Sequence, residues 1–451
     1  MFKKVLIANR GAVAARLVKA LRALGVRSAA AYSEADADLP YVAEADESCL
    51  IGPAPAPRSY LNQESILAAA RACGAEAIHP GYGFLSENAD FAEKVRAAGM
   101  VFIGPDPKWL KLMGDKTASR ALMATEGLPV GPSTGILTGS IEEQAAQAAA
   151  LGFPLLIKPA GGGGGIGMTP VQEADKLPAA LESAARLAAR CFSVPALYAE
   201  RLMTRPRHVE FQVVADQHGR AGHLFERDCS TQRRRQKVVE EAGAPGIPAA
   251  ELTAMADKAA KVMGRLGYDH LGTLETLYSP ESGFSFLEVN PRLQVEHGVT
   301  EEVTGLDLAA AQIRLAAGLA LDEALPGRPA AVRGHAVEAR IYAEDPENFF
   351  PSPGPLKVFK PPREARVRVE TGFAEGALVT PHYDPMIALV IVRGENRLEA
   401  LDLMHDALGE FAIEGLKTNL PFVRGLMKYE PFRAGLVHTG LTEEFLRNRK
   451  K

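Results

Sequence analysis

The pattern of apolar residues changes once along the chain, and this change constrains the fold more than any other feature. Over about the first 110 residues, short apolar runs alternate with helical patterns: the run 4–9 precedes a helical stretch at 12–24, and a second run follows at 27–33. Strands that alternate with helices are typical of a doubly wound parallel sheet. From residue 207 onward strands predominate, so we expect a different architecture there.

The second half of the chain predicts antiparallel hairpins. Residues 208–216 and 221–227 flank a Gln-His-Gly turn, and residues 272–278 and 284–290 flank a short turn. Paired runs of this kind with a short polar connection indicate β-hairpins. Between the two halves we expect a helix over 108–126, followed by a lobe of about seventy residues.

Length and composition bound the function. A chain of 451 residues exceeds what one hydrophobic core supports, so we expect several lobes with a cleft between them. The net charge of -4 gives no overall attraction for nucleic acid or anionic membranes. No apolar run reaches the roughly 18 residues of a membrane span, and the four cysteines show no disulfide or metal-ligand spacing. We therefore expect a cytoplasmic protein that binds anionic substrates locally.

A glycine run, Gly161–Gly165, follows an apolar run that ends in Lys158. A loop with so few side chains lets backbone amides approach phosphate oxygens, although a surface hairpin is the alternative for such a run alone. The Walker pattern fails because no Gly-Lys-Ser/Thr follows. The dinucleotide fingerprint also fails, since Gly11 stands alone after the first apolar run, although Glu34 could imitate a ribose-binding acid.

Two carboxylates, Glu275 and Glu288, lie on the predicted strands 272–278 and 284–290. Hairpin pairing would place them nearly opposite each other on one face. Their neighbours are mostly apolar, so a divalent cation such as magnesium is their natural partner, with Asn290 facing the same way. Two solvated strand carboxylates remain the alternative.

Dense mixed charge marks two further segments, 226–241 and 292–297. The basic triplet 233–235 is, taken alone, typical of a solvated face. Nucleic-acid binding would need a wider basic surface with interleaved aromatic residues, which the sequence lacks.

Together these segments resemble biotin carboxylase, a member of the ATP-grasp superfamily, over essentially the whole chain. The matching stretches are IANRG (7–11), HPGYGFLSEN (79–88), MGDK (113–116), IKPAGGGGG (157–165), RHVEFQV (207–213), ERDCS (226–230), QKVVEEA (236–242), EVNPRLQVEH (288–297), RGHAVEARIYAEDP (333–346), PSPG (351–354) and EGLKTN (414–419).

The resemblance implies an α/β and α+β chain with the ATP-grasp fold. It would contain an N-terminal doubly wound parallel-sheet domain, a lid domain and a C-terminal domain with antiparallel sheet. The implied boundaries are 1–113 for the N-terminal pre-ATP-grasp domain, 114–130 for a helical linker, 131–203 for the lid, 204–330 for the ATP-grasp core and 331–451 for the C-terminal domain.

The resemblance also implies where ATP and its metal ion bind. Lys116 and Lys158 would contact the phosphates, and Gly164 and Gly165 would belong to the closing lid. The remaining nucleotide contacts would come from Glu200, Arg201, Met203, His208, Gln232, Arg235 and Leu277. The magnesium or manganese ligands would be Glu275, Glu288 and Asn290.

For the chemistry, the resemblance implies a bicarbonate site at Lys237, Arg292, Gln294 and Val295, with Glu296 as the base. This agrees with the chemistry, because bicarbonate near pH 7 needs cationic binding and the removal of its proton before it attacks the γ-phosphate. The carboxyphosphate formed would release carbon dioxide and phosphate. The phosphate would take the ureido proton of biotin, and Arg340 would stabilise the biotin enolate.

The implied partners are a biotin carboxyl carrier protein, the subunits of a carboxyltransferase, and a second copy of the chain in a homodimer. Nucleic acid and membranes are not expected as partners. The assembly would be a biotin-dependent carboxylase such as acetyl-CoA carboxylase of fatty acid biosynthesis. No Met-Lys-Met biotinylation motif occurs in the chain, so we expect biotin to arrive on a separate protein.

Two departures from the family pattern keep alternatives open. Ile166 follows the glycine run where the family has arginine, and Arg235 stands where histidine is common. They motivate a second hypothesis, a catalytically impaired homologue with a regulatory or assembly role. The retained Glu296, Arg292 and Lys237 favour an active enzyme. A different ATP-grasp ligase is a third hypothesis, which the QVEH and RGHAVEAR motifs disfavour.

Overall fold

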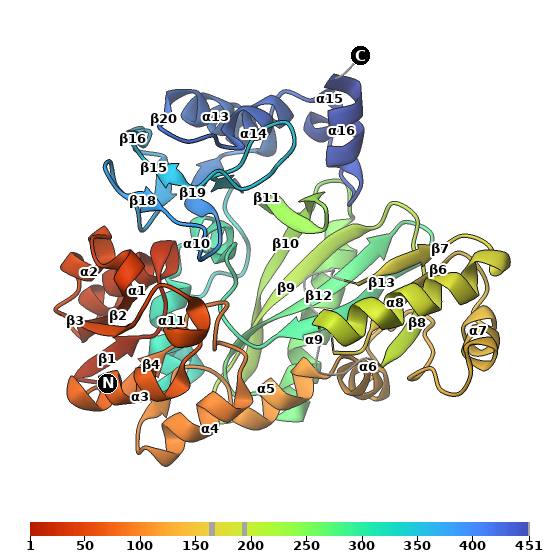
Figure 1. The fold of residues 1–451 in the computed structure, drawn as a ribbon, viewed down its shortest axis with the longest axis horizontal. Helices are drawn as coiled ribbons and strands as arrows, with labels where there is room; N and C mark the ends of the chain where they lie inside the picture. Colours follow the sequence, from red (N-terminus) through yellow and green to blue (C-terminus); the bar gives the residue numbers. More distant parts are fainter. Residues whose placement is uncertain (162–166, 192–195, 450–451) are drawn as a thin grey trace.

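The N-terminal region forms a five-stranded parallel sheet with the strand order β3-β2-β1-β4-β5 (Figure 1). In this computed structural model, residues 1–161, 167–191 and 196–449 are described. The central strand β1 pairs in parallel with β2 on one side and β4 on the other, which confirms the predicted doubly wound sheet. Its apolar run is continuous because parallel strands are covered on both faces.

The elements of this region are β1 (Lys4–Ile7), α1 (Gly11–Ala23), β2 (Arg27–Ser33), α2 (Pro40–Glu44), β3 (Glu47–Gly52), α3 (Gln63–Ala72), β4 (Ala77–His79), α4 (Ala89–Ala97) and β5 (Val101–Phe102), with single 3-10 turns at Glu34–Asp36 and Ala56–Arg58.

The helix predicted over 108–126 is two helices, α5 (Pro107–Gly114) and α6 (Lys116–Thr125). The break occurs at Asp115, whose carboxylate accepts the backbone N–H groups two and three residues further on, each at 3.0 Å. An aspartate that caps a new helix in this way ends the preceding one. The prediction of one continuous helix was therefore wrong, and the break places Lys116 at the first position of α6.

The region of the predicted lid holds a three-stranded antiparallel sheet, ordered β7-β6-β8, on the right of Figure 1. Among the described residues, its apolar cluster draws only on positions between 137 and 199. At its base the backbone N–H of Arg201 donates to the carbonyl of Pro132 at 3.0 Å, so the chain enters and leaves side by side. Its elements are α7 (Ile141–Ala149), β6 (Leu155–Pro159), β7 (Thr169–Val171), a 3-10 turn (Ala174–Lys176), α8 (Leu177–Cys191) and β8 (Leu197–Arg201).

An antiparallel sheet of eight strands, ordered β13-β12-β9-β10-β11-β14-β19-β17, occupies the centre of the molecule. The predicted hairpins are confirmed, because β9 pairs with β10 and β12 pairs with β13. Because β11 pairs with β14, the sheet contains strands from both sides of the domain boundary predicted at 330/331. The boundary stays a prediction. The strands are β9 (Arg207–Ala215), β10 (Ala221–Arg233), β11 (Gln236–Ala242), β12 (Leu271–Ser279), β13 (Gly283–Asn290), β14 (His335–Tyr342), β17 (Val367–Glu370) and β19 (Met386–Gly394).

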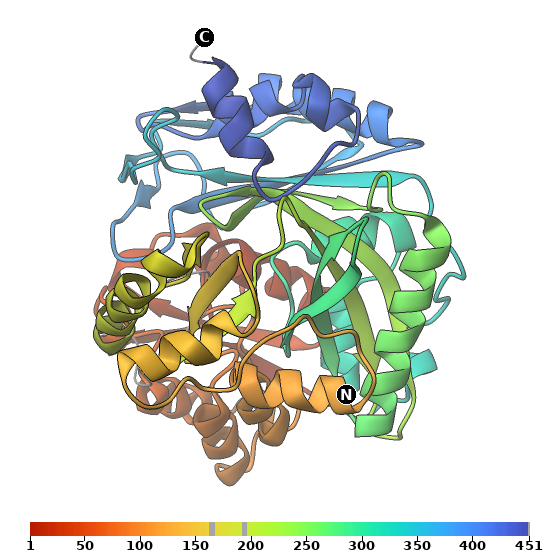
Figure 2. The same ribbon diagram turned by 90° about the vertical axis from the view of Figure 1, so that its right-hand side faces the viewer.

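Helices cover this sheet: α9 packs against β9 and β10, and both α10 and α13 pack against β14 and β19. In the turned view the C-terminal helices lie above the sheet and the lid region faces the viewer (Figure 2). The remaining elements are α9 (Ala249–Leu266), α10 (His297–Thr304), α11 (Leu308–Ala316), α12 (Leu321–Ala324), β15 (Gly354–Pro355), β16 (Val358–Lys360), β18 (Leu378–Val379), α13 (Arg397–Glu410), β20 (Ala412–Glu414), α14 (Leu420–Leu426), α15 (Glu430–Arg433) and α16 (Leu441–Arg449).

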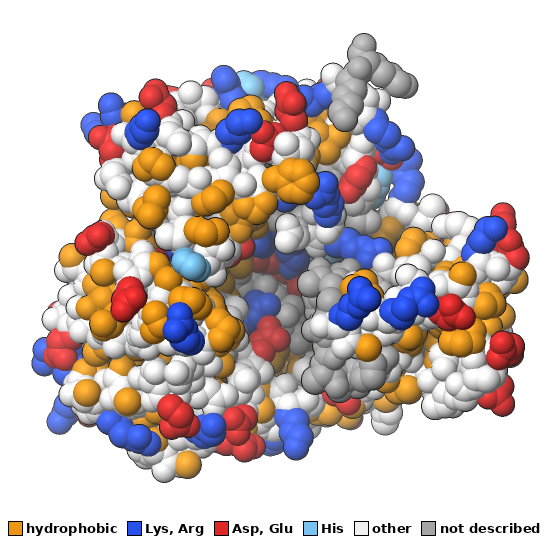
Figure 3. All heavy atoms as spheres, viewed as in Figure 1, with side chains coloured by type: hydrophobic (Ala, Val, Ile, Leu, Met, Phe, Trp, Pro, Cys, Tyr) orange, Lys and Arg blue, Asp and Glu red, His pale blue; other side chains and the backbone are white. Residues whose placement is uncertain are grey.

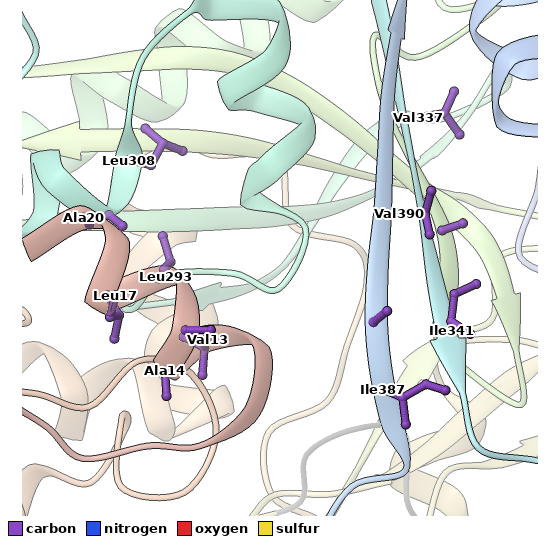
Figure 4. Packing of buried hydrophobic residues seen from close by; sticks show 14 of the residues in the cluster. Val13, Ala14, Leu17, Ala20, Leu293, Leu308, Val337, Ile341, Ile387 and Val390 are labelled. Carbon is purple, nitrogen blue, oxygen red and sulfur yellow. The ribbon is translucent and has the colours of Figure 1, made fainter. Parts of the chain in front are cut away.

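One large apolar cluster joins the N-terminal region to the sheet and to the C-terminal helices. Figure 4 shows Val13 and Leu17 of α1 near Leu293, and Val337 of β14 near Val390 of β19. Burial of this shared surface stabilises these parts as one body. No helix within the described ranges is long and apolar enough to cross a membrane.

Candidate active site

A cavity of about 860 Å³ lies between the N-terminal region, the lid region and the large sheet. The molecule is visibly hollowed there, with acidic and basic side chains gathered in the centre of Figure 3. Gly164 and Gly165 lie outside the described residues. All the other predicted site residues line the cavity: Lys116, Lys158, Glu200, Arg201, Met203, His208, Gln232, Arg235, Lys237, Glu275, Leu277, Glu288, Asn290, Arg292, Gln294, Val295, Glu296 and Arg340.

The β12–β13 hairpin places Glu275 directly opposite Glu288, as the sequence predicted. A register shift follows immediately, and bulges of this kind often lie beside functional sites. The Asn290 side-chain amide donates to Glu275 at 2.8 Å, and the Lys116 ammonium lies 2.9 Å from Glu288. The three predicted metal ligands therefore lie together at one edge of the sheet.

The chemistry of these donors fits a hard divalent cation. Burial alone would raise the pKa of Glu275, but the attraction of Lys237 and His208 outweighs it and holds this pKa well below its usual range. The site thus offers an ionised carboxylate, a second carboxylate and an amide oxygen. Magnesium takes few protein oxygens of this kind together with phosphate oxygens, so the residues present suit it.

The Lys237 ammonium lies among three carboxylates. Its nitrogen is 2.6 Å from Glu210, 2.9 Å from Glu275 and 2.5 Å from Glu296. Burial alone would lower the pKa of Lys237, but these carboxylates raise it well above its usual value. Lys237 therefore stays charged and forms the positive centre of the cavity floor.

Glu296 is fully buried and shared by two cations. One carboxylate oxygen contacts Lys237, and the other accepts a hydrogen bond from Arg340 at 2.9 Å. Burial alone would raise the pKa of Glu296, but Lys237 and Arg340 lower it far below its usual range. The buried Cys229 thiol stays protonated because burial raises its pKa, and it donates to Glu296 at 3.8 Å. Glu296 is thus a carboxylate at neutral pH.

Arg292 connects the sheet edge to the N-terminal region. It donates to Glu87 at 2.5 Å, to Asn290 at 3.2 Å and to Gln294 at 3.0 Å. Burial would lower the pKa of Arg292, but Glu87 outweighs this effect, so the guanidinium remains charged. A second cation therefore lies next to the predicted metal ligands.

The lid contributes Lys158, whose ammonium lies 2.6 Å from Glu200 on the neighbouring strand. Arg120 contacts the same carboxylate at 3.3 Å. Burial lowers the pKa of Lys158, and the pairing with Glu200 offsets only part of that shift. Arg235 reaches across from the β10–β11 hairpin to the carbonyl of Met168 at 3.4 Å.

Sequence reasoning missed the buried charges behind the cavity floor. Arg227 is completely buried and donates to Glu210 at 2.5 Å, and Glu240 accepts from Arg340 at the same distance. The solvated-face interpretation was wrong for Arg233, which is buried and paired with Glu344, because β10 continues to residue 233 rather than ending at 227. The only sequence feature that could have indicated the burial of Arg227, Arg233 and Glu240 is that they lie within a segment of dense mixed charge, 226–241.

Three family models match the chain. They are described as "Biotin carboxylase, N-terminal domain" over residues 1–110, "Carbamoyl-phosphate synthase L chain, ATP binding domain" over 115–324 and "Biotin carboxylase C-terminal domain" over 338–444. Together they span most of the chain and most of the residues that line the cavity.

Relatives align over almost the whole length. Biotin carboxylase 2 of Bacillus subtilis is 45% identical over 99% of this chain and 100% of its own. A pyruvate carboxylase subunit of Methanothermobacter thermautotrophicus is 44% identical over 99% and 91%. A solved biotin carboxylase domain dimer of 2-oxoglutarate carboxylase from Hydrogenobacter thermophilus, in complex with MgADP, ADP and bicarbonate, has a TM-score of 0.93 at 39% identity, with 98% of each chain covered.

Proposed function

The chain belongs to the biotin carboxylase family of ATP-dependent ligases, and on that premise we propose that it carboxylates biotin carried on a separate protein, using bicarbonate and ATP. The observation that carries the proposal is the buried Glu296 carboxylate, shared by Lys237 and Arg340 on the floor of the cavity. A base held between two cations is suited to an anionic substrate that must lose a proton.

Bicarbonate would bind against Lys237 and Arg292, beside Gln294 and the Val295 backbone. Its charge would then compete with Glu296 for the Lys237 ammonium. As Glu296 loses part of this stabilisation it becomes more basic, because the cation is what lowers its pKa. Glu296 takes the bicarbonate proton while a bicarbonate oxygen attacks the γ-phosphorus, and ADP leaves as carboxyphosphate forms.

Nucleotide binding would use both walls of the cavity. Lys116 and Lys158 would contact phosphate oxygens, and Glu275, Glu288 and Asn290 would hold the magnesium ion. When bound, such an ion neutralises negative charge that develops on the phosphates. Closure of the lid would exclude water, which would otherwise hydrolyse the mixed anhydride.

Biotin would be carboxylated in the same cavity. Carboxyphosphate breaks down to carbon dioxide and phosphate, and the phosphate removes the ureido proton of biotin. The resulting enolate carries negative charge on oxygen, which the Arg340 guanidinium would stabilise. The nitrogen then forms its bond to carbon dioxide, so the carboxyl group and the proton are both accounted for.

Two features support the proposed partners. The Bacillus subtilis relative named biotin carboxylase is matched over 100% of its own length, which favours a biotin carrier on a separate protein. The Hydrogenobacter relative is described as a domain dimer, which favours a homodimer here. The acyl acceptor would be chosen by a carboxyltransferase partner. We keep acetyl-CoA as the proposed acceptor, although a relative of nearly equal identity is named for pyruvate.

The test is release of phosphate from ATP by the purified chain. We expect release that requires both bicarbonate and free biotin, with label from bicarbonate appearing in carboxybiotin. Release that needs neither, or that depends on an amine acceptor, would support another ATP-grasp ligase. Absence of release despite normal Mg-ATP binding would support the impaired homologue.

A further inference from the structure

Two glutamates behind the cavity floor have no role in the chemistry above. Glu240 on β11 and Glu338 on β14 are direct partners in the antiparallel ladder, so their side chains share one face. Both residues are 0% exposed. Arg340, two residues beyond Glu338 on the same strand, projects to that face as well.

The two carboxyl groups differ in the hydrogen bonds that they accept. Glu240 accepts the Arg340 guanidinium on one oxygen at 2.5 Å. Its second oxygen and both oxygens of Glu338 accept no hydrogen bond from any described residue. Glu338 also packs tightly against the first turn of α10, since a Cβ atom added at Gly298 would lie 3.1 Å from a Glu338 oxygen.

Two adjacent buried carboxylates cannot both be ionised, because each charge would be taken out of water and would repel the other. One proton must therefore reside on the pair. Arg340 neutralises Glu240 but makes no hydrogen bond to Glu338, so the proton is held most stably on Glu338.

We propose that Glu338 is a neutral carboxylic acid that keeps its proton and donates a hydrogen bond to Glu240, and that this carboxyl pair positions Arg340 beside Glu296. A hydrogen bond from Glu338 would orient Glu240, which in turn holds one edge of the guanidinium. Arg340 could then keep its other contact, the 2.9 Å hydrogen bond to Glu296. The proposal rests on the role assigned to Arg340 in the biotin reaction, and Glu338 acts only through it.

The surrounding charges agree with this placement of the proton. Burial raises the pKa of Glu338 well above its usual range, and the neighbouring Glu240 raises it further. The pKa of Glu240 rises only to about 7, since Arg340 offsets part of the effect of burial. The other titratable groups that act on the pair are Lys237, Glu296, Arg368, Tyr82, Cys229 and Tyr342.

The proposal has a consequence at high pH. Once Glu338 loses its proton, two negative charges face the same guanidinium, and Arg340 is drawn from Glu296 toward the pair. Biotin carboxylation should therefore decline as Glu338 ionises. A glutamine at this position keeps a neutral donor of similar shape, whereas leucine keeps the volume but cannot donate.

The experiment compares the full-length wild type with Glu338→Gln and Glu338→Leu. In infrared difference spectra at pH 7 we expect the C=O stretching band of a protonated carboxylic acid in the wild type and its loss in Glu338→Gln. In kinetics we expect Glu338→Gln to stay within about three-fold of wild type and to lack the decline at high pH. Glu338→Leu should raise KM for biotin about ten-fold and leave KM for ATP unchanged.

Absence of the infrared band from the wild type, or its persistence in Glu338→Gln, would overturn the protonation. Equal biotin kinetics for Glu338→Gln and Glu338→Leu across the pH range would overturn the positioning role. If Glu338→Leu fails to fold, the infrared spectrum of Glu338→Gln still tests the protonation of Glu338, and its pH profile still tests the positioning role. If the wild type shows no biotin-dependent ATP cleavage, the proposed function fails, while the spectrum still locates the proton.

Discussion

The two walls of the cavity are built on different principles. The sheet wall is fixed by buried charges that tie several strands together, such as Lys237 with its three carboxylates and the fully buried Arg227. The lid wall has its own apolar cluster, and the substantial contacts of its described helices and strands are with one another. Among its described residues, the charged side chains that line the cavity are Lys158, Glu200 and Arg201, and Arg120 contacts Glu200 from α6.

This difference separates two tasks. Groups that must hold a proton or a developing charge need fixed partners, because misplacement weakens catalysis steeply. A wall that admits and encloses ATP has to move relative to the other, and a self-contained cluster can do so without exposing its core. On the proposed function, we therefore expect the sheet wall to carry the chemistry and the lid wall to enclose ATP.

The largest expected effect concerns the sheet wall. Glu296→Ala should lose bicarbonate-dependent ATP cleavage by at least about 100-fold, the usual contribution of a general base, while it binds Mg-ATP with near wild-type affinity. Glu288→Ala should also lose phosphoryl transfer from carbamoyl phosphate to ADP, which needs the metal but no deprotonation of bicarbonate. Steady-state rates of both reactions in both variants provide the measurement.

The matched pair also tests the assignment of Glu296. If Glu296→Ala loses the transfer from carbamoyl phosphate as completely as Glu288→Ala does, then Glu296 is a metal or structural residue rather than the base. In that case the sheet wall would still carry the chemistry, but the residues that perform it would lie at the β12–β13 edge.

The second prediction tests whether the lid is a separate body. Leu181 in α8 and Leu274 in β12 are both fully buried, in different apolar clusters. Leu181→Ala should destabilise the lid by about 2–5 kcal/mol and speed amide exchange in β6 and α8 alone. Leu274→Ala, the control, should speed exchange in β9 and β12. Equal acceleration in the large sheet by Leu181→Ala would contradict the separation.

The third prediction concerns the charges that join the sheet to the C-terminal helices. Glu241 accepts hydrogen bonds from Arg397 at 2.6 and 3.0 Å and lies 2.7 Å from His335. Burial alone would raise the pKa of Glu241, but Arg397 and His335 hold it at about 2, compared with an ordinary value of 4.5. The carboxylate therefore adds stability above pH 4.5, on the order of 3 kcal/mol, which is lost as the pH falls toward 2.

Denaturant unfolding between pH 6 and pH 2.5 measures this contribution. Glu241→Gln should be less stable at pH 6 and should lose less stability on acidification than the wild type. Parallel stability curves for the two proteins would show that this carboxylate is not one of the groups that fasten the sheet wall.

The smallest effect is expected at the lid wall. Lys158→Met should raise KM for ATP about ten-fold, because one charged contact to phosphate is lost, and should leave KM for biotin unchanged. Glu200→Gln provides the control, since it keeps Lys158 but removes its carboxylate partner. A fall in kcat as large as that of Glu296→Ala would show that Lys158 takes part in the chemical step. The proposed division of roles between the two walls would then be wrong.

The sequence could predict contacts between residues that lie close together along the chain. The facing of Glu275 and Glu288 followed from a single hairpin with a short turn, and the parallel sheet followed from local alternation of strands and helices. The predicted site residues came from the family resemblance, and every one of them within the described ranges lines the same cavity.

The parts that were missed depend on distant pairings. Glu240 meets Glu338 only because β11 pairs with β14, almost one hundred residues further along, and periodicity in either strand says nothing about that partner. Arg233 looked like a surface cation because its pairing with Glu344 is equally remote. The helix break at Asp115 was local, and the capping side chain was the signal that could have revealed it.

The hydrogen bond between Arg201 and Pro132 at the base of the lid has a further consequence. This bond holds the segment that enters the lid beside the segment that leaves it. The lid is therefore an inserted region whose two ends are adjacent. Domains inserted in this way are exchangeable, since removing one leaves a gap that a short linker can close. A chimera with the lid of a relative should therefore keep the eight-stranded sheet intact, which makes nucleotide affinity and turnover separately adjustable by recombination.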